Sequence, residues 1–283
     1  RSSTLALHTK SLEFQISPVA EMSTVDMPIS HLFEQLNFCE ILDILTGILL
    51  ERRIVIISRD ISVLTPMLRS LCSLIKPFEW KHVLIPVLPE MEAYSAFMSA
   101  PLPFIMGASS LPLYTLGPDV LVFNYDERVR SGFDSLPPLP RNLVDHLRRW
   151  LKMLVPQLVD HATHVLSAQP LTALTSAQVR LTFFHFMVEI LFRCQEHLER
   201  SEFHISLSKK VVTAWGEECH FVAELTATQL FQTYCIEADK PTTHGVVKEF
   251  LGIVRDNNGL IPSVKSFFCK SRMLDETLIV LEK

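Results

Sequence analysis

The sequence has few of the residues and motifs that mark most α/β enzymes. Its 283 residues include only 8 glycines. It contains neither a G-x-G-x-x-G nor a G-x-x-x-x-G-K-[ST] motif, which excludes the usual dinucleotide-binding and P-loop sites. It also has no G-x-S-x-G nucleophile elbow. The serines of residues 107–110 have no partner base that the sequence reveals. We therefore predict no catalytic residues and no cofactor.

A surplus of positive charge and a long apolar run are also missing. The net charge of -5 leaves nothing to neutralise a phosphate backbone, so nucleic acid is not an expected partner. The longest nearly apolar stretch, residues 181–192, contains His185 and Glu189 and is shorter than the ~20 residues that span a bilayer. Six cysteines are spread without a C-x-x-C pair, which is typical of reduced thiols in a cytoplasmic protein. The first residues resemble neither a signal peptide nor a natural start, and we expect a fragment of a longer chain.

The first half of the chain alternates between helical and strand patterns. Unbroken apolar runs predict strands that are buried on both faces, and such strands alternating with helices are typical of parallel sheets. We therefore predict an α/β fold with a mostly parallel sheet and helices on both of its faces. Pro86 places its strand at an edge or a bulge, because proline cannot donate to the ladder. The predicted strands cover 53–58, 82–89, 104–107 and 119–126, with an isolated edge strand at 11–17, and the predicted helices cover 38–50, 65–75 and 90–98.

After a proline-rich stretch at residues 135–140 the patterns become helical. Asn37 and Glu40 form a capping box for the first helix of the chain, and Thr175 and Gln178 are expected to do the same for a long helix ending near Glu199. Further helices are predicted over 142–154, 209–238 and 243–256. The predicted organisation is an N-terminal extension at 1–28, a central α/β domain at 29–155, a helical segment at 156–240 and a C-terminal helical extension at 241–283.

Two polar clusters have simple structural interpretations. Asp160, His161 and His164 form a D-H-x-x-H pattern that could share a metal ion, but no third ligand cluster accompanies it, so we predict solvated side chains and no metal site. Arg148, Arg149 and Lys152 form a basic strip opposite the apolar side of their helix. Such a strip is usually a solvated face, and the alternative is contact with an acidic partner or a membrane surface.

The segment LLERRIVIIS, residues 49–58, joins a buried helix to a buried strand. Arg52 and Arg53 follow the helix, where cations interact favourably with its unpaired carbonyl groups. This junction leads into the amino end of the strand, whereas ligands of parallel sheets bind at the carboxyl ends. We therefore interpret Glu51, Arg52 and Arg53 as a structural hinge.

These same residues carry a family resemblance. LLERRIVIIS, followed by KPFEWKHVLIPVLPEMEAYSAFMSAPLPFIMGASS at residues 76–110, resembles the central segment of DENN-domain proteins, and FVAELTATQLFQTYC at residues 221–235 resembles their downstream helical segment. The resemblance covers roughly residues 29–238 and implies the C-terminal lobe of a DENN domain. The motif residues that we single out are Glu51, Arg52, Arg53, Pro77, Trp80, His82, Pro86, Pro101, Pro103 and Gly107.

The resemblance implies a function that requires no catalytic side chain. DENN proteins typically act as guanine-nucleotide exchange factors for Rab GTPases, with a longin-like module before this lobe. That module would be in the same chain or another one, and the protein would be cytoplasmic and recruited to vesicle or organelle membranes. The alternatives are a DENN-fold scaffold in a multi-chain complex and a folliculin-like GTPase-activating protein. From the geometry of parallel sheets we expect the GTPase to contact loops at the carboxyl ends of the strands. The residues expected there are Arg59, Asp60, Ser109, Ser110, Asn124, Tyr125 and Asp126.

Overall fold

The computed structural model describes most of residues 36–154 and parts of the remaining chain. The described residues are 2–7, 10–15, 29, 32–33, 36–91, 94, 96–111, 116–154, 173–195, 198–200, 205–207 and 219–238. The predicted helix at 243–256 and the Asp160, His161 and His164 cluster lie outside them.

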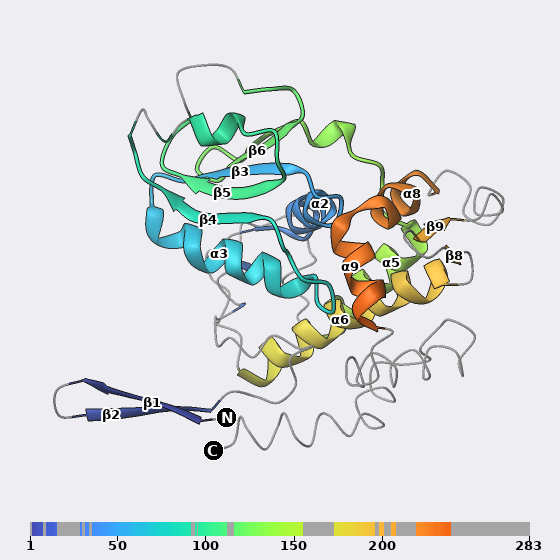
Figure 1. Cartoon of the computed structure of the whole chain (residues 1–283), viewed down its shortest axis with the longest axis horizontal. Helices are drawn as coiled ribbons and strands as arrows, with labels where there is room; N and C mark the ends of the chain where they lie inside the picture. The colour runs from blue at the N-terminus through green and yellow to red at the C-terminus, as the bar shows by residue number, and fades with distance from the viewer. Residues whose placement is uncertain are drawn as a thin grey trace.

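A mostly parallel five-stranded sheet forms the α/β part of the chain, as predicted (Figure 1). Its order is β4-β5-β3-β6-β7, and only β7 is antiparallel to its neighbour. The strands are β3 (Arg53–Ile57), β4 (Val83–Leu88), β5 (Phe104–Ala108), β6 (Val120–Asn124) and β7 (Val129–Ser131). The position of β4 confirms the prediction from Pro86, because β4 is an edge strand and its register with β5 shifts between Ile85 and Leu88.

The two faces of the sheet are covered very differently. Helices α2 (Phe38–Leu49) and α3 (Ile61–Leu74) pack on the face that carries Ile54, Ile56 and Leu121. The other face, with Val55 and Met106, packs among the described residues against the short 3-10 helix η1 (Ala96–Ser99), through Met98. Figure 1 shows α3 on one side of the sheet and this short turn on the other. Of the helix predicted at 90–98, the structure describes η1 and one further helical residue, Tyr94, while residues 92, 93 and 95 lie outside the described part.

Local capping determines where the helices begin. Asn37 and Glu40 form the predicted capping box of α2, at N–O distances of 2.8 and 2.9 Å. Helix α3 begins four residues earlier than predicted because the Asp60 carboxylate accepts hydrogen bonds from the backbone NH and the hydroxyl of Ser62. Both hydrogen bonds lower the pKa of Asp60, and the bond from the Ser62 hydroxyl group has the larger effect. The helix then continues through Pro66.

The second half is mainly helical, with differences from prediction. Its helices are α5 (Arg141–Leu154), α6 (Ala173–Gln195), α8 (Cys219–Ala227) and α9 (Gln229–Ala238). Because α6 already begins at Ala173, the predicted cap at Thr175 is wrong. The helix predicted over 209–238 is interrupted at Thr228, whose hydroxyl accepts the NH of Phe231 and donates to the carbonyl of Leu225. A side chain that bonds the backbone in this way ends one helix and caps the next.

Three groups of strands in the structure differ from the prediction. The edge strand predicted at 11–17 is found as β2 (Lys10–Gln15), but it pairs with an unpredicted strand, β1 (Ser2–Leu7), in a hairpin that lies apart from the five-stranded sheet in Figure 1. Strands β8 (Leu198–Arg200) and β9 (Ile205–Leu207) form a second short antiparallel pair. Strand β7 has three exposed residues and is too short to give a periodic signal.

One hydrophobic core joins the α/β part to the helical part. It contains Ile41 and Leu45 of α2 together with Phe183 of α6 and Phe231 of α9, all essentially inaccessible to solvent. Cys39, Cys72, Cys194 and Cys235 are free thiols, and burial raises the pKa of Cys72 to about 12. Among the described residues no helix combines the length and the hydropathy that a membrane crossing requires.

At Gly107 of β5 the neighbouring strand leaves no space for a side chain. A β-carbon added there would lie 2.2 Å from the carbonyl oxygen of Pro86 in β4. We expect Gly107→Ala to lower the free energy of unfolding by about 1–3 kcal/mol, because relief of the overlap requires the backbone of β4 to move. At Gly47 the nearest atom is a flexible methyl group of Leu121, and alanine also favours a helix, so Gly47→Ala should change the stability by less than about 1 kcal/mol. Urea unfolding of both variants measures the contrast, and equal losses would contradict it.

A buried polar cluster lies between α5 and α6. The rings of Trp150 and His185 stack with centroids 4.8 Å apart, and Nδ1 of His146 lies 3.3 Å from Oε1 of Glu189. Burial lowers the pKa of His185 to about 4, against the opposing effect of the Glu189 carboxylate, so this ring is neutral at pH 7.

The pKa of His185 predicts an acid-sensitive contribution to stability. Between pH 6.5 and about 4 the unfolded chain binds a proton at His185 that the folded chain does not, so stability falls as the pH falls through this range. We expect His185→Phe, which keeps an aromatic ring beside Trp150, to reduce the slope of unfolding free energy against pH. Chemical unfolding at several pH values tests this, and parallel slopes for both proteins would refute it.

Candidate functional site

The loops that follow β3, β5 and β6 meet at the carboxyl edge of the sheet. The backbone NH of Ser58 donates to the carbonyl of Ala108 at 3.0 Å, and that of Tyr125 donates to the carbonyl of Ile57 at 2.8 Å. These bonds continue the parallel pairing beyond the strands. The structure therefore brings together residues 58–60, 109–110 and 124–126, which include all seven residues that the sequence analysis expects at this edge.

Asp126 joins two of these loops. Its Oδ2 accepts the backbone NH of Arg59 at 2.8 Å, and its Oδ1 accepts the hydroxyl of Ser58 at 3.1 Å. At the end of β6, the side-chain oxygen of Asn124 accepts the NH of Glu127 at 3.1 Å and closes a turn. Asp126 and Asn124 thus shape the loops as well as facing solvent in full or in part.

The remaining expected residues differ in how free they are. Tyr125 is half-buried, with the Arg128 guanidinium 4.7 Å from its ring centre, and burial raises its pKa. Ser110 is exposed and its hydroxyl lies 3.4 Å from a carboxylate oxygen of Glu90. Arg59 is exposed, and Ser109 is half-buried. The edge therefore presents a guanidinium group, hydroxyl groups and carboxylates to solvent.

Three apolar residues at this edge were not predicted from the sequence. Ile61, Met91 and Leu111 follow the carboxyl ends of β3, β4 and β5, and their side chains are exposed. Apolar residues beside strands are usually assigned to the core, so their sequence pattern gave no sign of exposure. Their position just after the carboxyl ends of parallel strands, rather than their apolar character, was the signal that could have identified them.

The opposite edge of the sheet is closed by the ERR segment. Glu51 has a positive φ of 51° and ends α2, with its NH and that of Arg52 donating to the carbonyls of Ile48 and Gly47. This is the Schellman arrangement, in which glycine is the usual residue at the left-handed position. The carboxylate of Glu51 accepts the NH groups of Gln229 and Leu230, at 2.9 and 2.7 Å, at the start of α9.

The arginines have partners other than the helix end predicted for them. Arg52 pairs with Glu224 of α8, and Arg53 pairs with Asp119 and donates to the carbonyl of Ala100 at 3.1 Å. Their guanidinium groups therefore tie the junction to α8 and to the segments that enter β5 and β6. These are contacts within the chain.

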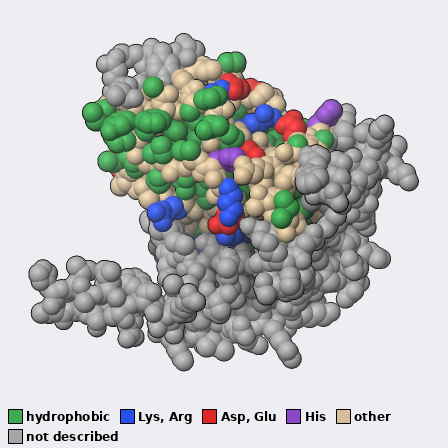
Figure 2. All heavy atoms as spheres, viewed as in Figure 1, with side chains coloured by type: hydrophobic (Ala, Val, Ile, Leu, Met, Phe, Trp, Pro, Cys, Tyr) green, Lys and Arg blue, Asp and Glu red, His purple; other side chains and the backbone are tan. Residues whose placement is uncertain are grey.

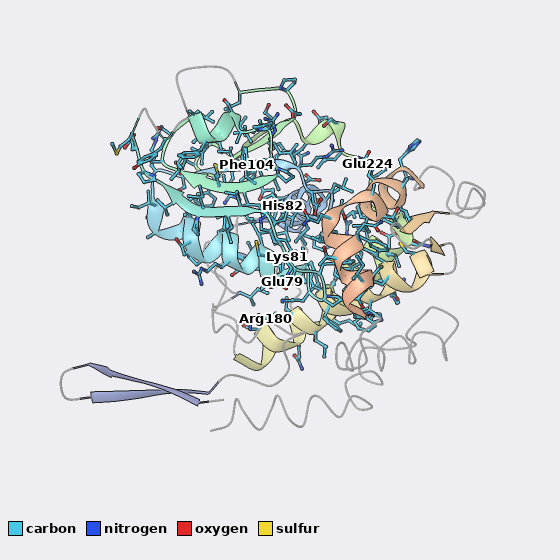
Figure 3. The ribbon with its side chains drawn as sticks, in the orientation of Figure 1. Glu79, Lys81, His82, Phe104, Arg180 and Glu224 are labelled. Carbon is cyan, nitrogen blue, oxygen red and sulfur yellow. The ribbon has the colours of Figure 1, made fainter. Side chains whose placement is uncertain are left out.

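The other motif residues surround the same junction. Nε2 of His82 lies 2.9 Å from the Glu51 carboxylate. Figure 3 shows His82 where the sheet meets the helical part of the chain, to which Glu224 of α8 belongs. The indole of Trp80 donates to the carbonyl of Val83 at 3.2 Å, and its ring lies edge-on to that of His82. Pro77 has a cis peptide bond and precedes Phe78, which packs against Phe231 and Tyr234 of α9. Pro101 and Pro103 lead into β5, while Pro86 and Gly107 are the close contact between β4 and β5.

A groove of about 460 Å³ separates α2, the proline-rich connection and α5. Its polar lining includes Asp43, which pairs with Arg130, and Arg148, whose guanidinium lies 5.2 Å from the ring centre of Phe38. Burial raises the pKa of Asp43 and its partner Arg130 opposes the change. In the basic strip of α5, therefore, Arg148 lies against an aromatic ring, and Arg149 donates to the carbonyl of Asp145 at 3.3 Å. No cluster of metal-ligating residues is found within the described part of the chain.

The contacts of Glu51 predict an unusual effect of the substitution Glu51→Gly on the free energy of unfolding. Glycine would remove the cost of a positive φ, which alone would stabilise the chain by about 1 kcal/mol. It would also remove the acceptor for two NH groups of α9, and loss of a helix cap costs roughly 1–2 kcal/mol. Because both NH groups lose their acceptor, we expect Glu51→Gly to lower the free energy of unfolding, measured in urea. Glu51→Gln, which keeps one acceptor oxygen at the same reach, should lose less, and a more stable glycine variant would contradict the capping role.

Comparisons with known proteins give the family. The profile of the DENN (AEX-3) domain matches residues 1–127. The human DENN domain-containing protein 2A is 29% identical over 230 residues, which cover 74% of this chain and 22% of the relative. The human DENN domain-containing protein 2D is 26% identical over 228 residues, covering 75% and 44%, and the MAP kinase-activating death domain protein of Caenorhabditis elegans is 30% identical over 168 residues, covering 55% and 12%. The chain thus spans less than half of each of these relatives. With its parallel sheet and helical second half, the chain belongs to the DENN-domain proteins.

Proposed function

We propose that this chain is the C-terminal lobe of a DENN-type guanine-nucleotide exchange factor that promotes GDP release from a Rab GTPase in membrane trafficking. The observation that carries the proposal is the DENN family membership, because the family is known for exchange activity on Rab GTPases. The convergence of three loops at the carboxyl edge supports it by providing a surface for a protein partner.

Exchange is driven by differences in binding rather than by acid–base chemistry. Consider an exchange protein that binds the nucleotide-free GTPase more tightly than the nucleotide-bound form. By reciprocity it lowers the affinity of the GTPase for nucleotide by the ratio of these two binding constants. Such a factor needs a rigid surface. At the proposed surface, Asp126 fixes the loop after β3 and Asp60 caps α3, so the exposed groups are held on ordered backbone.

The proposal includes further parts of the assembly. A longin-like module, in the same or another chain, would complete the GTPase-binding site together with the central α/β domain, residues 29–155, and the helical segment, residues 156–240. The protein would act in the cytoplasm and be recruited to vesicle or organelle membranes. The continuous core between sheet and helices supports treating the two segments as one rigid unit.

The test is release of a fluorescent GDP analogue from a panel of Rab GTPases by the full-length protein that contains this chain. Arg59 is the preferred probe, because reversing the charge of Asp126 would also break its bonds to Ser58 and Arg59. We expect Arg59→Glu to slow release about three- to tenfold, because the variant loses the charge-assisted hydrogen bonds that the guanidinium group would donate directly to the GTPase. Arg149→Glu, an exposed charge change on α5, is the matched control and should leave the rate unchanged.

The same assay separates the alternative functions. Faster hydrolysis of bound GTP without faster GDP release would replace the exchange role with a GTPase-activating one. An unchanged rate of GDP release across the whole Rab panel would reject the exchange function. Equal release by the Arg59→Glu variant and the unaltered protein would reject the placement of the surface at this edge.

A further inference from the structure

Three large apolar side chains are exposed at the carboxyl edge of the sheet. Ile61, Met91 and Leu111 have 52%, 58% and 46% of their surface accessible. Single exposed apolar residues are common, but three from successive loops on one edge mark an interaction surface. The loops are connected, because Ser110 lies within 3.4 Å of Glu90 and Ser58 bonds Ala108.

This apolar surface continues onto the connection between β4 and β5. Tyr94 and Phe97, in the connection between β4 and β5, are 37% and 48% exposed, and their rings stack 6.0 Å apart. Figure 2 shows hydrophobic side chains gathered on the part of the molecule formed by β4, β5 and their connection. Tyr94 is also linked by its NH to the carbonyl of Met91. The exposed apolar residues thus extend from the edge onto an adjacent face.

Negative charge borders the apolar residues. Asp60 precedes Ile61, Glu90 precedes Met91, and Asp126 and Glu127 lie in the adjoining loop, all exposed. Among the described residues the positive groups nearby are fewer, since Arg59 is exposed but Arg128 is paired with Glu40 at 3.2 Å. The hydrogen bonds from Ser62 lower the pKa of Asp60, which keeps its carboxylate charged. The edge is therefore an apolar centre with a net acidic border.

We propose that Ile61, Met91 and Leu111 form the apolar centre of the GTPase-binding surface, and that the acidic border selects a partner face whose apolar residues are flanked by lysine and arginine. This inference rests on the proposed exchange function and specifies the chemistry of its partner. An anionic membrane is a poor occupant, because its negative surface attracts basic segments and would repel this border. Apolar contacts supply most of the binding energy of such a surface, and the charged border mainly raises the association rate.

Matched variants test the apolar centre. Met91→Ser with Leu111→Ser removes two exposed apolar groups, whereas Met153→Ser with Ile236→Ser removes two of similar exposure on α5 and α9. Binding to nucleotide-free Rab, for the Rab that responds in the release assay, is measured by surface plasmon resonance with the full-length protein. We expect the edge variant to bind at least about tenfold more weakly, through faster dissociation, and the control variant to bind normally. Thermal unfolding confirms that each variant remains folded.

A charge variant tests the border. Glu127→Lys should slow association and weaken its dependence on NaCl concentration, whereas Asp145→Lys, an exposed charge change on α5, should alter neither. Glu127 is chosen over Asp60 because Asp60 also caps α3.

The outcomes distinguish this inference from the proposed function. If the unaltered protein binds and releases nucleotide from a Rab but the edge and control variants have equal affinities, the apolar centre is refuted while the exchange function stands. Normal association of Glu127→Lys at low salt refutes the acidic border. Lack of binding to every nucleotide-free Rab refutes the proposed function and this inference together. Binding to phosphatidylserine vesicles that the edge variant loses would assign the surface to a membrane and also refute the inference.

Discussion

The fold depends on the contact between the Glu51 carboxylate and the first NH groups of α9. Glu51 ends α2 in a backbone conformation that glycine usually adopts, and its side chain is placed to cap a helix almost 180 residues later in the chain. Arg52 adds an ion pair to α8, and Phe78 adds aromatic packing on α9. Two family motifs that are remote in the sequence, at residues 49–58 and 221–235, therefore meet in space. Their separation along the chain hid this relation, since a residue's partner cannot be identified from local spacing.

The junction also separates the two edges of the sheet. The amino edge is occupied by contacts within the chain, in which Glu51, Arg52 and Arg53 each have a defined partner. The carboxyl edge has side chains that shape loops, such as Asp126, together with side chains that lack such a task, such as Met91 and Leu111. A parallel sheet produces this division because its strands run in the same direction. The loops that follow the strands therefore all begin at the carboxyl edge. The proposed GTPase surface uses the edge that the junction leaves open.

Sequence patterns predicted the features that depend on local chemistry. The buried strands followed from runs such as Ile54–Ile57, the first helix from Asn37 and Glu40, and the edge position of β4 from Pro86. The loops at the carboxyl edge were also predictable, because strand direction follows from the alternation of strands and helices. Features that depend on tertiary contacts were not predictable. The partners of Arg52 and Arg53, the capping of α9 by Glu51 and the exposure of Ile61 are decided by residues far away in the sequence or by what covers a face.

The continuous core sets the smallest piece of this chain that can fold. Phe78 lies against Phe231 and Tyr234, and Phe33 lies against Phe183, so the helices α6 and α9 cover residues of the α/β part. A truncation after α5 would expose Phe33 and Phe78 to water and remove the NH groups of α9 that donate to the Glu51 carboxylate. The two segments are therefore distinct in architecture but not autonomous, and recombinant fragments or chimaeras should exchange them as one block that reaches at least to Ala238.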